Sequence, residues 1–178
     1  MTRILPISAV LLALAAPAFA AGSDSTTPPT STSTTTKCEK GQVFDDKTQK
    51  CLDAKSESVT DDDRYHAARE LAYNGKYDRA LEVLASAENQ EDPRILNYYG
   101  FTNRKLGNSD EAMEFYQAAL AVDPDYILAR SYMGQGLAAA GDLAGATEQL
   151  EEIALRGGRD SWAYESLMRA IGGVAVDY

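Results

Sequence analysis

The sequence predicts an all-α fold, an α-solenoid of about three stacked helix pairs, and two observations support this prediction. Small residues recur at spacings of 32 and 34 positions; they are Gly75, Gly107, Gly141, Ala80, Ala112 and Ala146. Self-similarity at this period is typical of stacked helix pairs. Residues 61–178, which carry the repeat, are long enough for one ordinary domain, and 44% of the chain is apolar, enough for a core.

The first 20 residues have the features of a secretory signal peptide. Arg3 gives a short positive start, residues 4–16 form a charge-free apolar run, and residues 18–20 read Ala-Phe-Ala. We expect cleavage between Ala20 and Ala21, and release into the periplasm or the medium. The apolar run is shorter than the ~20 residues that span a bilayer, so no membrane insertion is expected after cleavage.

The next segment, residues 21–37, is predicted to be a disordered linker. Residues 25–36 are only Ser, Thr and Pro, and such a stretch buries too little apolar area to offset its backbone entropy. Glycosylation of this stretch stays open.

Two cysteines, Cys38 and Cys51, enclose the next predicted unit, residues 38–52. Turn residues and the pair Val43-Phe44 between them favour a small hairpin closed by a structural disulfide, which an oxidising compartment permits. A redox pair usually has two intervening residues rather than twelve, and a metal site needs more ligands. Residues 53–60 are predicted to be a second linker between this loop and the repeats. We therefore expect the disulfide to stabilise only its own loop.

From residue 61 onward the chain resembles the tetratricopeptide-repeat family. On a 34-position ruler the repeats are 61–92, 93–126 and 127–160, followed by a capping helix at 161–171 and a tail at 172–178. Three positions of the repeat carry the resemblance. Position 8 is a small residue (Ala68, Gly100, Gly134), position 20 is alanine (Ala80, Ala112, Ala146), and position 24 is a bulky residue (Leu84, Tyr116, Leu150). Small residues let the two helices of a repeat cross closely. Position 4 departs from the family's aromatic residue in all three repeats, where it is Arg64, Leu96 and Arg130.

The sequence offers no set of residues that could catalyse a reaction. Its one histidine, His66, falls within a predicted helix without a partner, and nucleotide-binding and nucleophile motifs are absent. A net charge of −10 disfavours nucleic acid as a partner, because phosphate binding needs surplus Lys and Arg. We therefore expect no enzyme activity, no metal and no cofactor.

The resemblance to tetratricopeptide repeats implies a concave face built from positions 2, 5, 9, 12 and 13 of each first helix. From those positions we select as groove residues Tyr65, Arg69, Tyr73, Arg94, Asn97, Phe101, Arg104, Lys105, Leu128, Ser131 and Gln135, with Trp162 at position 2 of the capping helix. Four cations and no carboxylate stand in this set, although Asp62 and Glu165 fall at matching positions near its ends. The set predicts either a positive, aromatic groove for an acidic or C-terminal peptide, or an ordinary solvated helix face.

These features favour a non-enzymatic, exported protein–protein interaction module, a scaffold or adaptor for an unidentified protein or peptide. Two alternatives stay open: a structural protein that assembles with itself, and an accessory subunit of a cell-envelope enzyme. The oligomeric state is not predicted.

Overall fold

The structure, a computed structural model, describes residues 31–174. The predicted signal peptide, its cleavage site at Ala20–Ala21 and residues 21–30 lie outside this range. The elements, in chain order, are α1 (Ser33–Thr36), β1 (Gln42–Asp45), β2 (Lys50–Asp53), α2 (Asp61–Tyr73), α3 (Tyr77–Leu84), α4 (Pro93–Leu106), α5 (Ser109–Val122), α6 (Ile127–Ala139), α7 (Leu143–Leu155) and α8 (Trp162–Ile171). Within the described residues the fold is the predicted α-solenoid.

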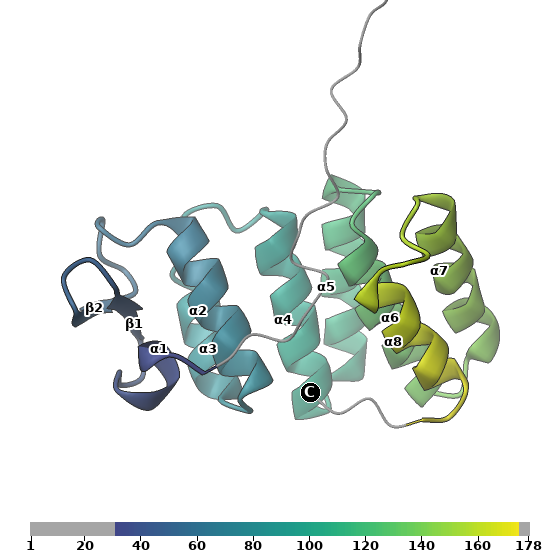
Figure 1. The fold of residues 1–178 in the computed structure, drawn as a ribbon, viewed down its shortest axis with the longest axis horizontal. Helices are drawn as coiled ribbons and strands as arrows, with labels where there is room; N and C mark the ends of the chain where they lie inside the picture. The colour runs from purple at the N-terminus through teal and green to yellow at the C-terminus, as the bar shows by residue number, and fades with distance from the viewer. Residues whose placement is uncertain (1–30, 175–178) are drawn as a thin grey trace, which may run out of the picture.

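Three antiparallel helix pairs, α2–α3, α4–α5 and α6–α7, follow one another along the long axis of the molecule (Figure 1). The hairpin lies at one end of the row, and α8 packs against α6 and α7 at the other. Each pair turns at a glycine with positive φ, 69° at Gly75, 90° at Gly107 and 86° at Gly141. Only glycine adopts this conformation without steric cost, so these three residues fix the turns.

Close packing between paired helices depends on small residues, as the sequence predicts. A β-carbon added at Gly100 on α4 would lie 2.6 Å from the ring of Tyr116 on α5. Ala112, on the facing side of α5, is 1% exposed. At Gly134 on α6 the nearest side chain is instead Leu167 of α8, 2.7 Å from the added β-carbon. The capping helix therefore uses the same kind of small-residue contact as a helix pair.

An aromatic column connects the first helices of successive pairs. Tyr65 on α2 meets Tyr98 on α4 edge-on at 5.6 Å between ring centroids, and Tyr98 meets Tyr132 on α6 at 6.3 Å. Tyr132 in turn meets Trp162 on α8 at 6.4 Å. Edge-to-face pairs at these distances are favourable beyond the area that they bury. The column joins the repeats and the capping helix into one core.

The prediction of a disordered linker is wrong for residues 31–37. Residues 33–36 form the helical turn α1, which packs against α2. The carboxylate of Glu70 on α2, 5% exposed, accepts hydrogen bonds from the backbone N–H of Thr32 at 2.8 Å and of Thr35 at 3.0 Å, and from both threonine hydroxyls. Hydrogen bonds to a buried charge are strong, and they compensate the entropy of ordering this segment.

The expectation that the cysteine loop stands apart from the repeats is also wrong. Cys38 and Cys51 are joined by a disulfide, and β1 pairs antiparallel with β2 as the predicted hairpin. Val43 of this hairpin belongs to the same buried cluster as the side chains of α2, together with Ala54 and Val59. We call residues 31–59 the N-terminal module; it shares a core with the first repeat.

Two arginines of the first repeat hold the N-terminal module by its backbone. Arg64 on α2, 2% exposed, donates from Nε to the carbonyl oxygen of Ala54 at 2.8 Å and forms an ion pair with Asp61 at 2.7 Å. Arg79 on α3 donates from Nη2 to the carbonyl oxygens of Thr34 at 2.8 Å and Cys38 at 2.9 Å. In the first repeat, position 4 is thus occupied by an arginine that binds the backbone of the module.

Side-chain caps define most of the described helix starts. Thr60 and Asp63 form a reciprocal capping box at α2, and Asp142 accepts a hydrogen bond from the N–H of Gly145 at 2.9 Å. Asn108 precedes α5 but makes no side-chain cap; its amide donates to Asn103 instead. No helix in residues 31–174 is long and apolar enough to cross a bilayer.

Candidate functional site

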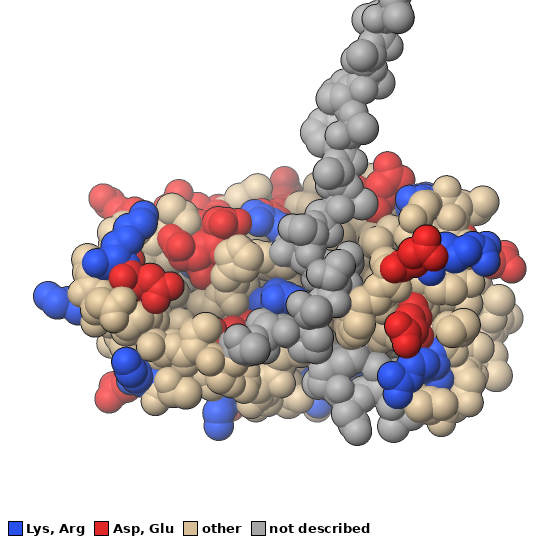
Figure 2. Space-filling view, viewed as in Figure 1, with Lys and Arg blue, Asp and Glu red and all other residues tan. Residues whose placement is uncertain are grey.

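The predicted groove residues come from the first helix of each pair, and five of them form a compact group. We call Arg69, Tyr73, Phe101, Arg104 and Lys105 the trough; the first two lie on α2 and the others on α4. In Figure 2, acidic side chains gather mainly in the upper half of the face shown.

Stacked aromatic rings form the floor of the trough. The rings of Tyr73 and Phe101 lie nearly parallel, 5.3 Å apart at an angle of 16°. The guanidinium of Arg104 and the ammonium of Lys105 each lie 5.7 Å from the centroid of the Phe101 ring. Cations at this distance from a ring face are attracted by its quadrupole. The stack therefore gathers positive charge from two neighbouring residues of α4 at one point.

Tyrosine hydroxyls accept hydrogen bonds from both arginines of the trough. Arg69 donates from Nε to the Tyr98 hydroxyl at 3.1 Å and lies 5.5 Å from the centroid of the Tyr73 ring. Arg104 donates from Nε to the Tyr116 hydroxyl at 3.4 Å, and the hydroxyls of Tyr73 and Tyr132 are hydrogen-bonded. Burial raises the pKa of Tyr116 to about 12. These hydroxyls stay protonated at neutral pH, so they orient the guanidinium groups without cancelling their charge.

The positive charge of Arg94, in the first turn of α4, is neutralised by acidic residues. It forms ion pairs at 2.8 Å with Asp92 and at 2.7 Å with Asp62. Its hydrogen bonds to Asp92 and then Asp62 raise the pKa of the guanidinium. The two carboxylates outnumber this arginine, so the local charge here is not positive. We therefore leave Arg94 out of the trough.

Several predicted groove residues are buried. Tyr65, Asn97, Phe101 and Ser131 are each 0% exposed, and Gln135 is 5% exposed. Ser131 donates to the carbonyl oxygen of Ala163 at 2.7 Å, which ties α6 to α8. This hydrogen bond of Ser131 holds two helices together. Asn97 differs from it, because its Oδ1 is buried without a donor among the described residues.

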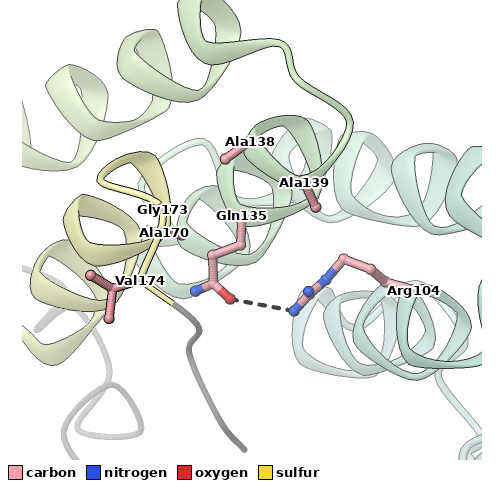
Figure 3. Close-up of a pocket in the computed structure, with 7 residues that line it drawn as sticks. All are labelled: Arg104, Gln135, Ala138, Ala139, Ala170, Gly173 and Val174. Atoms are coloured by element: carbon pink, nitrogen blue, oxygen red, sulfur yellow. Dashed lines mark hydrogen bonds between the residues drawn. The ribbon is translucent and has the colours of Figure 1, made fainter.

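A cavity of about 350 Å³ opens next to the trough (Figure 3). Arg104 of α4 and Gln135 of α6 point toward each other across it, with Nη2 donating to Oε1 at 3.4 Å. The rest of the lining is apolar: Ala138, Ala139, Ala170, Gly173 and Val174. Sequence reasoning did not name these residues, although Ala138 and Ala139 occupy positions 12 and 13 of the third repeat. The repeat spacing was a signal that could have found these two alanines.

The remaining predicted residues lie at the borders of this region. Trp162 packs on Tyr132 at the start of α8, and His66 is exposed, 3.6 Å from Asp62. Within residues 31–174 no three His, Cys, Asp or Glu side chains are grouped as metal ligands would be.

Comparison with known families agrees with this geometry. Residues 93–126, which contain α4 and α5, match the family model described as tetratricopeptide repeat. This middle helix pair is thus similar to a tetratricopeptide repeat, and the pairs α2–α3 and α6–α7 flank it in the same antiparallel arrangement. Such repeats indicate a protein–protein interaction module.

One relative of this chain is the "Probable biofilm formation methyltransferase WspC" of Pseudomonas putida strain KT2440. It is 34% identical over 93 residues, which cover 51% of this chain and 22% of the methyltransferase. The chain thus spans about a fifth of the length of that relative. No solved structure matches the chain significantly.

Proposed function

We propose that this chain is an exported, non-enzymatic scaffold or adaptor that binds an acidic segment of a protein partner on its concave face. The observation that supports the proposal most is the convergence of Arg104 and Lys105 on the Phe101 ring, beside a cavity that Arg104 and Gln135 line together with small apolar residues. A carboxylate of the partner would form charge-assisted hydrogen bonds with these cations. A neighbouring apolar side chain would enter the cavity.

Export is the second part of the proposal. The N-terminal sequence has the features of a signal peptide, and the disulfide between Cys38 and Cys51 suits an oxidising compartment. N-terminal sequencing of the chain recovered from the producing cell's envelope should give Ala21 as the first residue. An intact Met1 on the exported chain would contradict this.

The trough can be tested by charge reversal. The probe position for a photoreactive residue is Tyr73 of the trough. Leu155, which is 80% exposed on α7, serves as the negative position. A partner captured from Tyr73 is identified by mass spectrometry. Arg104→Glu with Lys105→Glu should then abolish capture of that partner by an affinity-tagged chain, with helix content unchanged by circular dichroism.

A matched control separates local charge from net charge. Lys76→Glu with Arg159→Glu changes the net charge equally at two exposed positions outside the trough. This control should retain capture. Capture that survives the trough reversal at low and physiological salt would place the binding surface elsewhere. Light scattering after size-exclusion chromatography tests self-assembly, because a monomer at micromolar concentration disfavours the structural alternative.

The likeness to a methyltransferase does not by itself extend that activity to this chain, which covers 22% of that protein. We infer a non-catalytic role from the repeats and from the absence of nucleotide-binding and nucleophile motifs in the sequence. An accessory subunit of an envelope enzyme remains an outcome of the capture experiment: recovery of a single enzyme would favour it.

A further inference from the structure

The outward side of the capping helix α8 carries an apolar stripe. Tyr164, Met168 and Ile171 recur at intervals of four and three residues, so they lie on one side of the helix. Met168 is 49% exposed, and the other two are partly buried against the core. Ala163 and Leu167, both 0% exposed, form the opposite, inward side. The last helix of a repeat array usually has a polar outer side, so this stripe is suited to a further contact.

The stripe lies where a helix pair would continue. Met168 occupies position 8 of its unit, the position at which Gly100 of α4 meets Tyr116 on the second helix of that pair. Figure 1 shows α8 at the end of the row, packed on α6 and α7. The described chain ends at Val174, three residues after α8, and none of the described helices takes the place of a second helix beside it.

Two opposite charges flank the stripe on one side. Glu165 and Arg169 are both exposed, one helical turn apart, and neither forms an ion pair with another residue of the described range 31–174. Figure 2 shows acidic and basic side chains close together at this end of the molecule. The charges are therefore available to a second molecule that covers the stripe.

The order of these charges fits a second copy of the same helix. When two identical helices pack antiparallel about a two-fold axis, the same flank of each helix meets with its direction reversed. Glu165 of one copy then faces Arg169 of the other, and the contact occurs twice. A parallel pair would instead place this charged flank against the apolar flank with Tyr164 and Ile171. Only the antiparallel arrangement matches both the charges and the stripe.

We propose that α8 is a dimerisation surface, on which two copies of this chain pair antiparallel through Tyr164, Met168 and Ile171. Such a contact is isologous, so it closes at two copies and does not grow into a filament. The trough lies on α2 and α4, whereas α8 packs on α6 and α7, so each copy keeps its trough outside the contact. The dimer presents two troughs. This goes beyond the proposed function, which concerns the trough alone.

Sedimentation equilibrium of the purified chain tests the surface. The unmodified chain should be a dimer in the micromolar range. Met168→Lys should raise the dissociation constant at least about tenfold, because two ammonium groups meet at the apolar centre of the contact. The matched control is Val122→Lys, at a side chain that is 53% exposed on α5, and it should leave the dimer unchanged. An unmodified chain that stays monomeric, or a dimer that is insensitive to Met168→Lys, would overturn the proposal.

A charge exchange tests the antiparallel arrangement. Glu165→Arg alone and Arg169→Glu alone each bring like charges together twice, so each variant should be largely monomeric, with unchanged helix content by circular dichroism. In a mixture of the two variants every contact again joins opposite charges. Native mass spectrometry should therefore find heterodimers of one copy of each. A mixture that stays monomeric would show that these two residues do not face each other.

The dimer and the proposed function fail separately. Arg104→Glu with Lys105→Glu should abolish partner capture and leave the dimer intact. A monomeric chain that still captures its partner would overturn the dimer and leave the proposed function in place; if its capture is lost in Met168→Lys, the partner itself covers the stripe. A dimer that depends on Met168 and captures its partner despite the trough reversal would support the dimer and place partner binding elsewhere.

Discussion

Gly100 on α4 lies so close to Tyr116 on α5 that a β-carbon at position 100 would be 2.6 Å from a ring atom. Tyr116 is fully buried, and its hydroxyl accepts a hydrogen bond from Arg104 of the trough. The packing of the second repeat and the orientation of a trough cation thus depend on the same side chain.

Gly100→Ala should therefore destabilise the protein, because the Tyr116 ring has to move in a filled core. Overpacking of this kind costs about 1–3 kcal/mol. The matched control is Gly136→Ala on α6, where an added β-carbon meets the flexible Arg104 side chain at 3.3 Å. Alanine favours helix over glycine by about 1 kcal/mol, so the control should be neutral or stabilising in urea denaturation. Equal losses at both positions would contradict this account.

Glu70→Gln should loosen the N-terminal module from the first repeat. The change removes a buried charge that accepts hydrogen bonds from Thr32 and Thr35, and it leaves an amide N–H₂ facing their N–H groups. We expect a loss of about 1–3 kcal/mol in the free energy of unfolding. Hydrogen exchange at residues 32–38 should rise. Glu88→Gln, at a side chain that is 77% exposed, is the control and should cost little.

Replacing both cysteines by serine should lower the melting temperature of the helices, and not that of the hairpin alone. Closing this loop contributes about 3 kcal/mol by the chain-entropy model. Because the module shares a core with α2, we expect the helical transition at 222 nm to fall by about 10 °C. The loss should be less than additive with Glu70→Gln, since each change undocks the same module. An unchanged helical transition would show that the module contributes nothing to the first repeat.

Alkaline unfolding should begin where the buried tyrosines ionise. Burial raises the pKa of Tyr116 to about 12 and those of Tyr98 and Tyr132 well above their ordinary value. A raised pKa in the folded state means that this stabilisation is fully present below about pH 10, the unfolded value, and is lost as the pH rises through the folded value. Absorbance at 295 nm should show exposed tyrosines titrating first and these three only as helix is lost. A single step near pH 10 with intact helices would contradict this.

The repeat period made the helical part of the fold predictable. Gly75, Gly107 and Gly141 adopt the positive φ that their turn positions require, and Gly100 makes the close contact expected at position 8. These features follow from local sterics at fixed spacings, which a single sequence displays. The hairpin between Cys38 and Cys51 was visible for the same reason.

The docked N-terminal module was not predicted, because its order depends on residues far away in the sequence. A Ser/Thr stretch has too little apolar area to fold alone, and composition does not show that Glu70 accepts its hydrogen bonds across 35 and 38 residues. The arginine at position 4 was not a specific signal, because the third repeat also has one there, Arg130. Only the structure shows that Arg64 holds the carbonyl oxygen of Ala54.

The candidate site was predicted only in part. The spacing named the trough cations, but it did not show that Asp62 and Asp92 pair with Arg94. The spacing also did not single out Ala138 and Ala139. A small apolar side chain gives no sign of binding in a sequence, and only the structure shows that these two line a cavity. Ion pairing and cavity shape are properties of the packed array.

The N-terminal module at one end and α8 at the other limit how this protein can change in length during evolution. Duplicating the first repeat would require a second copy of Glu70, Arg64 and Arg79 that has no module to hold. A different repeat inserted before α8 would keep the contact with Leu167 only if it had a glycine in the place of Gly134. An insertion that copies α4 and α5 leaves both ends intact. Homologues of different length should therefore differ in the number of middle repeats.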